Sequence, residues 1–416
     1  MLSFIKLLQQ SQVGKYALVQ ILSKLLTLIS TYIIAIHSSN TVFGYITVLQ
    51  ASLLVSITFF GFNLQNAFMR YYFERPLKDI YTKVAPIYIG LICITLLFST
   101  IIAFYFYHHK YYFWFSLLPI IGLGNGIVLV VSLLARSNKK ISVYAQTELV
   151  RPISLAFLST FFILNPKLEI ISHYIFTLFI SMCITLFLCY VNKNKLSYNE
   201  TLQSPSSNSF TSKSILLYIF PLFLVQIMSL INNISDRYIL QLFVSISEIG
   251  LYGKAYLIGS SIGLLFDSLM LLWSPFVMKN KNGLVIKYFQ TIRKFALSTF
   301  ALSLFLLMIS ILLYYFDFYS YDISKKLIVT TTIVCSAFIA RIGYQLITPL
   351  YNAYDKTTLV AKISFFSMIF GFIFNFILIP MTGIYGAAIA TYLSFASFSL
   401  LSLSLLKQPK NEVSTQ

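Results

Sequence analysis

The sequence predicts an all-α, polytopic membrane protein with twelve transmembrane helices in two related six-helix bundles around a central cavity. Of its 416 residues, 58% are hydrophobic and only 10% are charged, against about 25% charged residues in an ordinary soluble domain. A water-soluble fold of this composition would expose apolar surface that it could not cover. The hydrophobic residues also gather in runs long enough to cross a bilayer as helices, which takes about 20 residues. A soluble or peripheral protein is therefore excluded.

Apolar runs bounded by charges, by Pro or Gly, or by polar clusters define the spans. The second run is longer than one crossing requires, so we expect its helix to leave the membrane near Gly61. No alternation of the outer-membrane-barrel kind competes with this interpretation. The predicted spans are 13–36, 43–69, 84–107, 112–134, 144–164, 170–191, 214–234, 249–273, 293–316, 327–351, 359–380 and 384–406.

The longest predicted connection is a polar, Ser/Asn-rich segment near the middle of the chain, which is typical of a flexible linker. The two halves also look related, because Pro166 ends the fifth span and Pro380 ends the eleventh, 214 residues later. Six spans return the chain to the same side, so the repeat would be parallel. The predicted organisation is an N-terminal bundle over 1–191, a cytoplasmic linker over 192–213, a C-terminal bundle over 214–406 and a cytoplasmic tail over 407–416.

The charge balance is strongly basic, with 30 Lys and Arg against 12 Asp and Glu, a formal net charge of +18. In a membrane protein, Lys and Arg collect in cytoplasmic loops. With the N-terminus inside, nineteen basic residues fall in cytoplasmic segments and five in the opposite loops, Arg237 among these five. We therefore expect both termini in the cytoplasm, and the excess of positive charge does not indicate nucleic acid as a partner.

Six basic residues remain within the predicted spans. Lys24 and Arg341 lie near the middle of theirs, too deep for their side chains to reach the membrane surface. Arg151 and Lys254 are at intermediate depth. Lys15 and Lys362 lie close to cytoplasmic helix ends, so their long side chains can reach the membrane surface and need no partner within the span.

Polar residues share helix faces with the two deepest cations. Gln20 lies four residues before Lys24, and Gln345 lies four residues after Arg341, so each pair faces one side of its helix. Such stripes either hold helices together by hydrogen bonds or line a water-accessible cavity. With six cations and only two acids, a cavity here would be positive and would suit an anionic headgroup such as a diphosphate.

The two acids within spans are Glu148 and Asp267. Glu148 lies three residues before Arg151, and this spacing predicts a structural ion pair on one helix. Either acid could instead be a protonation site for ion coupling. The four cysteines lie in apolar runs without metal-ligand spacing. No HExxH, GxSxG or Gly-rich phosphate-binding motif occurs, so we expect no metal, no cofactor and no enzymatic activity.

Two stretches of the second half carry a family resemblance. Asp236-Arg237, followed by Gly250 and Tyr252, resembles a signature at the eighth span of Wzx-type polysaccharide (O-antigen) flippases. The stretch from Asn375 through Gly383 and Gly386 is similar to the ending of the same proteins. This family is the polysaccharide-exporter branch of the multidrug/oligosaccharidyl-lipid/polysaccharide superfamily, and the resemblance implies a MATE-like fold over essentially the whole chain.

The resemblance also implies a function. Such a flippase moves oligosaccharide repeat units linked to undecaprenyl diphosphate across the bacterial cytoplasmic (inner) membrane by alternating access, driven by an ion gradient or the membrane potential. The repeat unit would serve O-antigen (lipopolysaccharide) or another surface polysaccharide, and a polysaccharide polymerase and a chain-length regulator would be protein partners. The substrate-binding residues that we expect are Lys24, Arg341, Arg151, Lys254, Gln20 and Gln345.

Two other classes stay open on the sequence. A drug or metabolite exporter of the same superfamily would share the fold. A membrane glycan polymerase or glycosyltransferase usually carries a large external catalytic loop, whereas the longest external connection predicted here, 235–248, has about 14 residues.

Overall fold

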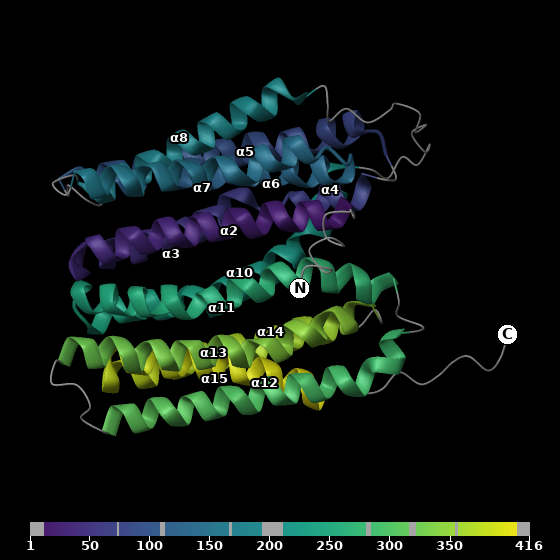
Figure 1. The fold of residues 1–416 in the computed structure, drawn as a ribbon. Helices are drawn as coiled ribbons and strands as arrows, with labels where there is room; N and C mark the ends of the chain where they lie inside the picture. The colour runs from purple at the N-terminus through teal and green to yellow at the C-terminus, as the bar shows by residue number, and fades with distance from the viewer. Residues whose placement is uncertain are drawn as a thin grey trace. The chain divides into compact units, whose positions relative to one another are not determined.

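The protein is an all-helical membrane protein in its computed structural model, which describes residues 12–72, 75–108, 113–165, 169–193, 211–279, 284–315, 322–353 and 357–405. These residues form thirteen α-helices and one 3-10 helix, and none of them lies in a strand (Figure 1). The chain divides into two compact units, residues 1–230 and 231–416, and the division falls within one long helix, α10.

The first unit contains the helices from α2 to α8 and the first part of α10. They are α2 (Gln12–His37), α3 (Asn40–Gly61), α4 (Gln65–Tyr71), α5 (Leu77–Tyr105), η1 (Phe113–Leu117), α6 (Leu118–Ser137), α7 (Ile141–Leu164) and α8 (Ile170–Val191).

The second unit contains the rest of α10 and five further helices. They are α10 (Ser212–Phe243), α11 (Ile246–Lys279), α12 (Leu284–Tyr315), α13 (Asp322–Ala353), α14 (Thr357–Thr382) and α15 (Ile384–Ser404). The expected bundle boundaries at 191 and 214 stay predictions, since residues 194–210 of the linker, like the tail over 407–416, lie outside the described residues.

Twelve helices are long and apolar enough to cross a membrane, and each of the twelve predicted spans has its counterpart among them. The helix of the second span ends at Gly61, as predicted. Phe62 and Asn63 follow with left-handed backbones (φ 46° and 54°). The Asn63 side chain accepts hydrogen bonds from the side chains of Gln65 (2.7 Å) and Asn66 (2.9 Å), which stabilises the turn into α4.

Several equivalent pairs of helices are packed together in both units. In the first unit α6 contacts α3, α5 and α8, and in the second α13 contacts α11, α12 and α15. The pair α7–α8 likewise corresponds to α14–α15 (Figure 1). These are the pairings that a parallel duplication of six helices produces, so the packing supports two related bundles.

Helix α10 is longer than the sequence indicated. The predicted span stopped at 234, and Arg237 was expected in an external connection over 235–248. Instead α10 continues to Phe243, and only Val244 and Ser245 separate it from α11. The polar residues near 236 resembled the end of a span, but they are buried and bonded within the second unit, so the helix does not end there.

Candidate functional site

A buried carboxylate joins three helices of the second unit. Asp236 of α10 is 4% exposed and accepts hydrogen bonds from the Tyr252 hydroxyl of α11 and from the backbone N–H of Arg237 (2.8 Å). The Tyr252 hydroxyl also lies 3.4 Å from the Thr391 hydroxyl of α15. A fully bonded polar group of this kind fixes one arrangement of its helices, because any other would leave a buried charge without partners.

Arg237 lies beside this carboxylate and is also buried. Its guanidinium carbon is 4.5 Å from the centre of the Tyr256 ring of α11, a cation–π contact. Its Nε atom has no hydrogen-bond partner among the described residues. Asp236, Arg237 and Tyr252 of the first sequence signature thus form one packed cluster, and Gly250 is buried two residues before Tyr252 on the same helix.

The second signature shapes the corner between α14 and α15. Gly383 has a left-handed backbone (φ 60°) at the residue before α15, a conformation that glycine adopts at no steric cost. A Cβ atom at Gly386 would collide with the Leu378 carbonyl of α14. Both glycines therefore allow a tight turn between two closely packed helices.

Arg341 lies in α13, nineteen residues after its first residue and twelve before its last. Its guanidinium carbon is 5.3 Å from the centre of the Phe395 ring of α15. One turn further along α13, the Gln345 amide donates a hydrogen bond to the Asp267 carboxylate of α11 (2.5 Å). The structure thus joins a residue expected to bind substrate to one expected to couple an ion.

Arg151 lies deeper in its helix than the sequence indicated. The predicted span began at 144, whereas α7 begins at Ile141, so Arg151 is ten residues from one end and thirteen from the other. Its Nε atom is buried and has no hydrogen-bond partner among the described residues. The expected ion pair with Glu148 is wrong in this part of the chain, since the Glu148 carboxylate accepts a hydrogen bond from Ser132 of α6 instead (2.8 Å).

Two polar residues that the sequence did not single out lie on neighbouring helices of the first unit. The Tyr174 hydroxyl of α8 accepts a hydrogen bond from the Gln50 amide of α3 (3.2 Å), and α8 packs against α7, the helix that carries Arg151. A polar contact therefore joins α3 and α8 within the span. The only sequence signal for Gln50 and Tyr174 is a polar group inside an apolar run.

Lys24 lies near the middle of α2, twelve residues after its first residue, and is partly buried. The side-chain oxygen of Gln20, one turn earlier, is buried without a hydrogen-bond partner among the described residues. Other polar residues of this helix are bonded: Thr27 and Thr31 donate to the carbonyls of Ser23 and Thr27 (2.9 and 2.8 Å), and Ser23 donates to the Glu148 carbonyl of α7 (2.9 Å).

The expected site residues belong to both units, and their assembly into one cavity stays a prediction. Among the described residues, no group of three or more His, Cys, Asp or Glu side chains could hold a metal ion. The first unit carries Gln20, Lys24, Glu148 and Arg151, and the second carries Lys254, Asp267, Arg341 and Gln345.

Solved structures of membrane transporters share this fold. The lipid II flippase MurJ, in an inward closed conformation, matches with a TM-score of 0.65 and 16% identity over 94% of this chain and 86% of that chain. The MATE multidrug transporter DinF-BH matches with a TM-score of 0.63 and 13% identity over 95% of each chain. An inward-facing multidrug resistance MATE family transporter of the MOP superfamily matches with a TM-score of 0.57 and 13% identity over 93% of this chain and 96% of that chain.

No protein-family model matches the sequence, and no curated protein matches it. The structural likeness establishes the fold: the chain has the twelve-helix architecture found in transporters of the MOP superfamily. This confirms the predicted fold class.

Proposed function

We propose that this protein is a flippase that moves undecaprenyl-diphosphate-linked oligosaccharide repeat units across the bacterial cytoplasmic membrane by alternating access. The fold is shared with a protein named as a lipid II flippase, and two sequence signatures resemble those of Wzx-type exporters. The observation that carries the proposal is Arg151, a cation near the middle of a span whose Nε atom is buried without a partner among the described residues.

A cation in this position indicates an anionic ligand for energetic reasons. A charged side chain near the bilayer centre costs about 2.5–3.5 kcal/mol even on insertion scales. A structural cation offsets that cost with a nearby acid, but Glu148 is bonded to Ser132 instead. Arginine binds phosphate oxygens through two parallel hydrogen bonds, so a diphosphate in a central cavity would supply the missing partner.

The other expected residues take roles around this cation. We assign Lys24, Arg341 and Lys254 to attraction of the diphosphate and Gln20 and Gln345 to its hydrogen bonding. For ion coupling, the bond from Gln345 links Asp267 to α13, the helix that carries Arg341, so we assign this role to Asp267 over Glu148.

The membrane arrangement follows from the charge count. The excess of Lys and Arg on one side supports a cytoplasmic location for both termini. The lipid-linked substrate would be assembled on that same side of the membrane. The polyprenyl tail would remain in lipid while the sugar crosses. A polysaccharide polymerase and a chain-length regulator would then act on the delivered repeat units.

The proposal is tested by substituting the mid-span cations in the native host. Lys24→Ala and Arg341→Ala should each abolish surface glycan and leave lipid-linked repeat units on the cytoplasmic side, while Arg341→Lys should retain part of the activity. Lys15→Ala is the matched control, because Lys15 is exposed near the start of the same helix as Lys24. Normal surface glycan in both alanine variants, at normal protein levels, would refute the cavity assignment.

A drug or metabolite exporter of the same superfamily is the second candidate, favoured by the MATE multidrug transporters that share the fold. Overexpression would then raise drug resistance, and deletion would leave surface glycan unchanged. Loss of glycan without altered drug resistance would support the flippase.

A further inference from the structure

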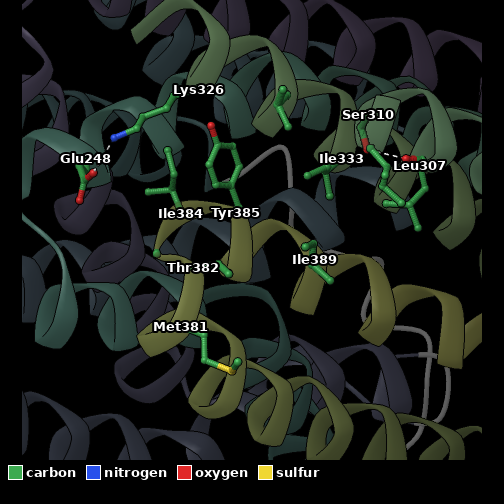
Figure 2. A pocket seen from close by; sticks show the side chains of 13 residues that line it. Glu248, Leu307, Ser310, Lys326, Ile333, Met381, Thr382, Ile384, Tyr385 and Ile389 are labelled. Carbon is green, nitrogen blue, oxygen red and sulfur yellow. Dashed lines mark hydrogen bonds and ion pairs between the residues drawn. The ribbon is translucent and has the colours of Figure 1, made fainter. Parts of the chain in front are cut away.

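A pocket of about 720 Å³ lies in the second unit, and its residues are outside the set proposed for transport. It is formed where α11, α13 and α15 begin and α14 ends, with one wall from the last part of α12 (Figure 2). Small-molecule sites measure about 300–1,000 Å³. The pocket is therefore large enough to hold part of a lipid.

The inner part of the pocket is apolar. Leu307 of α12, Val329 and Ile333 of α13 and Ile389 of α15 contribute aliphatic side chains. Ile333 lies seven residues beyond Lys326, which places it about 10 Å deeper along the helix. The pocket thus runs from the helix ends, at the membrane surface, into the depth of the span. A hydrocarbon chain fits such a path.

The opposite end of the pocket carries one charge of each sign. Lys326 of α13 and Glu248 of α11 form an ion pair of 3.4 Å, with side chains 30% and 35% exposed. Figure 2 shows this pair at one end, with Ile384 and Tyr385 between it and the aliphatic side chains of Leu307 and Ile333. A partly exposed ion pair contributes at most about 1 kcal/mol. A ligand that carries both charges can therefore separate Lys326 from Glu248 and bind each of them at little cost.

We propose that this pocket binds a phospholipid with a phosphoethanolamine headgroup, with one acyl chain in the aliphatic part. The lipid phosphate would bind the Lys326 ammonium, and the lipid amine would donate hydrogen bonds to the Glu248 carboxylate. An anionic headgroup without an amine would instead meet the negative charge of Glu248. A choline headgroup has no N–H donor for that carboxylate. The charge pattern therefore selects the aminophospholipid.

Lipid binding to the purified full chain tests this proposal. Phosphatidylethanolamine, phosphatidylglycerol and phosphatidylcholine with identical acyl chains are titrated separately, and bound lipid is counted by native mass spectrometry. The expected result is about tenfold tighter binding of phosphatidylethanolamine, the effect of one charge-assisted hydrogen bond. Equal affinity for the three lipids would overturn the proposal.

Substitutions in the pocket locate the binding. Ile311→Trp should fill part of the pocket and abolish the preference for phosphatidylethanolamine. Leu312→Trp should leave that preference intact, since Ile311 lines the pocket and its equally exposed neighbour Leu312 does not. Glu248→Gln should shift the preference toward phosphatidylglycerol by about tenfold. Lys325→Gln, a control next to Lys326 that does not line the pocket, should change nothing. A preference that survives Ile311→Trp in correctly folded protein would place the lipid elsewhere and contradict the assignment.

Discussion

At the residue scale, the second unit keeps a buried acid because its charge is fully bonded. Asp236 accepts hydrogen bonds from the Tyr252 hydroxyl and from the backbone N–H of Arg237. Burying the carboxylate charge is expensive, and these two hydrogen bonds offset part of that cost. The cluster therefore acts as a fixed point between α10, α11 and α15.

Removing one hydroxyl from this cluster should destabilise the protein. Tyr252→Phe takes away the donor to Asp236 and leaves a buried carboxylate oxygen without its bond, at a cost of about 2 kcal/mol. We expect a lower apparent unfolding temperature in detergent, measured by intrinsic fluorescence. Tyr105→Phe serves as the control, because Tyr105 is exposed. If both variants unfold at the wild-type temperature, the hydroxyl does not stabilise the buried acid.

Residue positions were predictable from the sequence, but residue partners were not. The depth of Lys24 and Arg341 follows from counting along an apolar run, and the structure places both near the middle of their helices. The bonds from Ser132 to Glu148 and from Gln345 to Asp267 join different helices. Spacing along one helix indicates only neighbours on that helix. Contacts that depend on packing between helices could therefore not be predicted from the sequence.

At the element scale, small residues allow helices of the first unit to approach closely. A Cβ atom at Gly126 of α6 would lie 2.5 Å from the Cα of Gly61 at the end of α3. In a membrane, helices associate through van der Waals contact and hydrogen bonds because lipid is as apolar as their side chains. The close approach of α3 and α6 therefore depends on this glycine.

Gly126→Ala should force the two helices apart, at a cost of about 1–3 kcal/mol, and reduce the yield of folded protein. Gly90→Ala is the matched control, since a Cβ at Gly90 of α5 would meet nothing within 4 Å. Alanine is the better helix former by about 1 kcal/mol, so this control should be neutral or slightly stabilising. Similar yields for both variants in a fluorescence-detected size-exclusion assay would contradict the close approach.

The existence of each membrane-spanning helix was predictable, whereas the short helices α4 and η1 and several helix ends were not. Composition and length alone identify the spans, and all twelve are present. The ends depend on tertiary contacts. Polar residues suggested that the seventh span stops at 234, but bonds within the second unit allow α10 to continue to Phe243. Helix α5 likewise begins at Leu77, seven residues before the predicted start.

At the scale of the whole molecule, two features recur along the chain: the helix pairs repeated in both units and the excess of basic residues in the predicted cytoplasmic segments. Helix α6 in the first unit and helix α13 in the second each contact at least four other helices, and the twelve-helix fold is shared with solved structures of the MurJ flippase and of a MATE transporter. The fold could be predicted from apolar runs and their duplication. The substrate could not, because fold and substrate are separate properties, and only the cations within the spans address it.

The proposed function requires that an anionic lipid-linked glycan binds the cations within the spans as it crosses the membrane. Purified protein in vesicles, loaded with undecaprenyl-diphosphate-linked oligosaccharide, tests it through the accessibility of the sugar to an impermeant glycosidase. We predict that the wild-type chain and Lys15→Ala expose the sugar, and that Arg151→Ala slows exposure at least about tenfold, the loss of one charge-assisted contact. Equal rates for the wild type and Arg151→Ala, or no exposure by the wild type, would contradict the account.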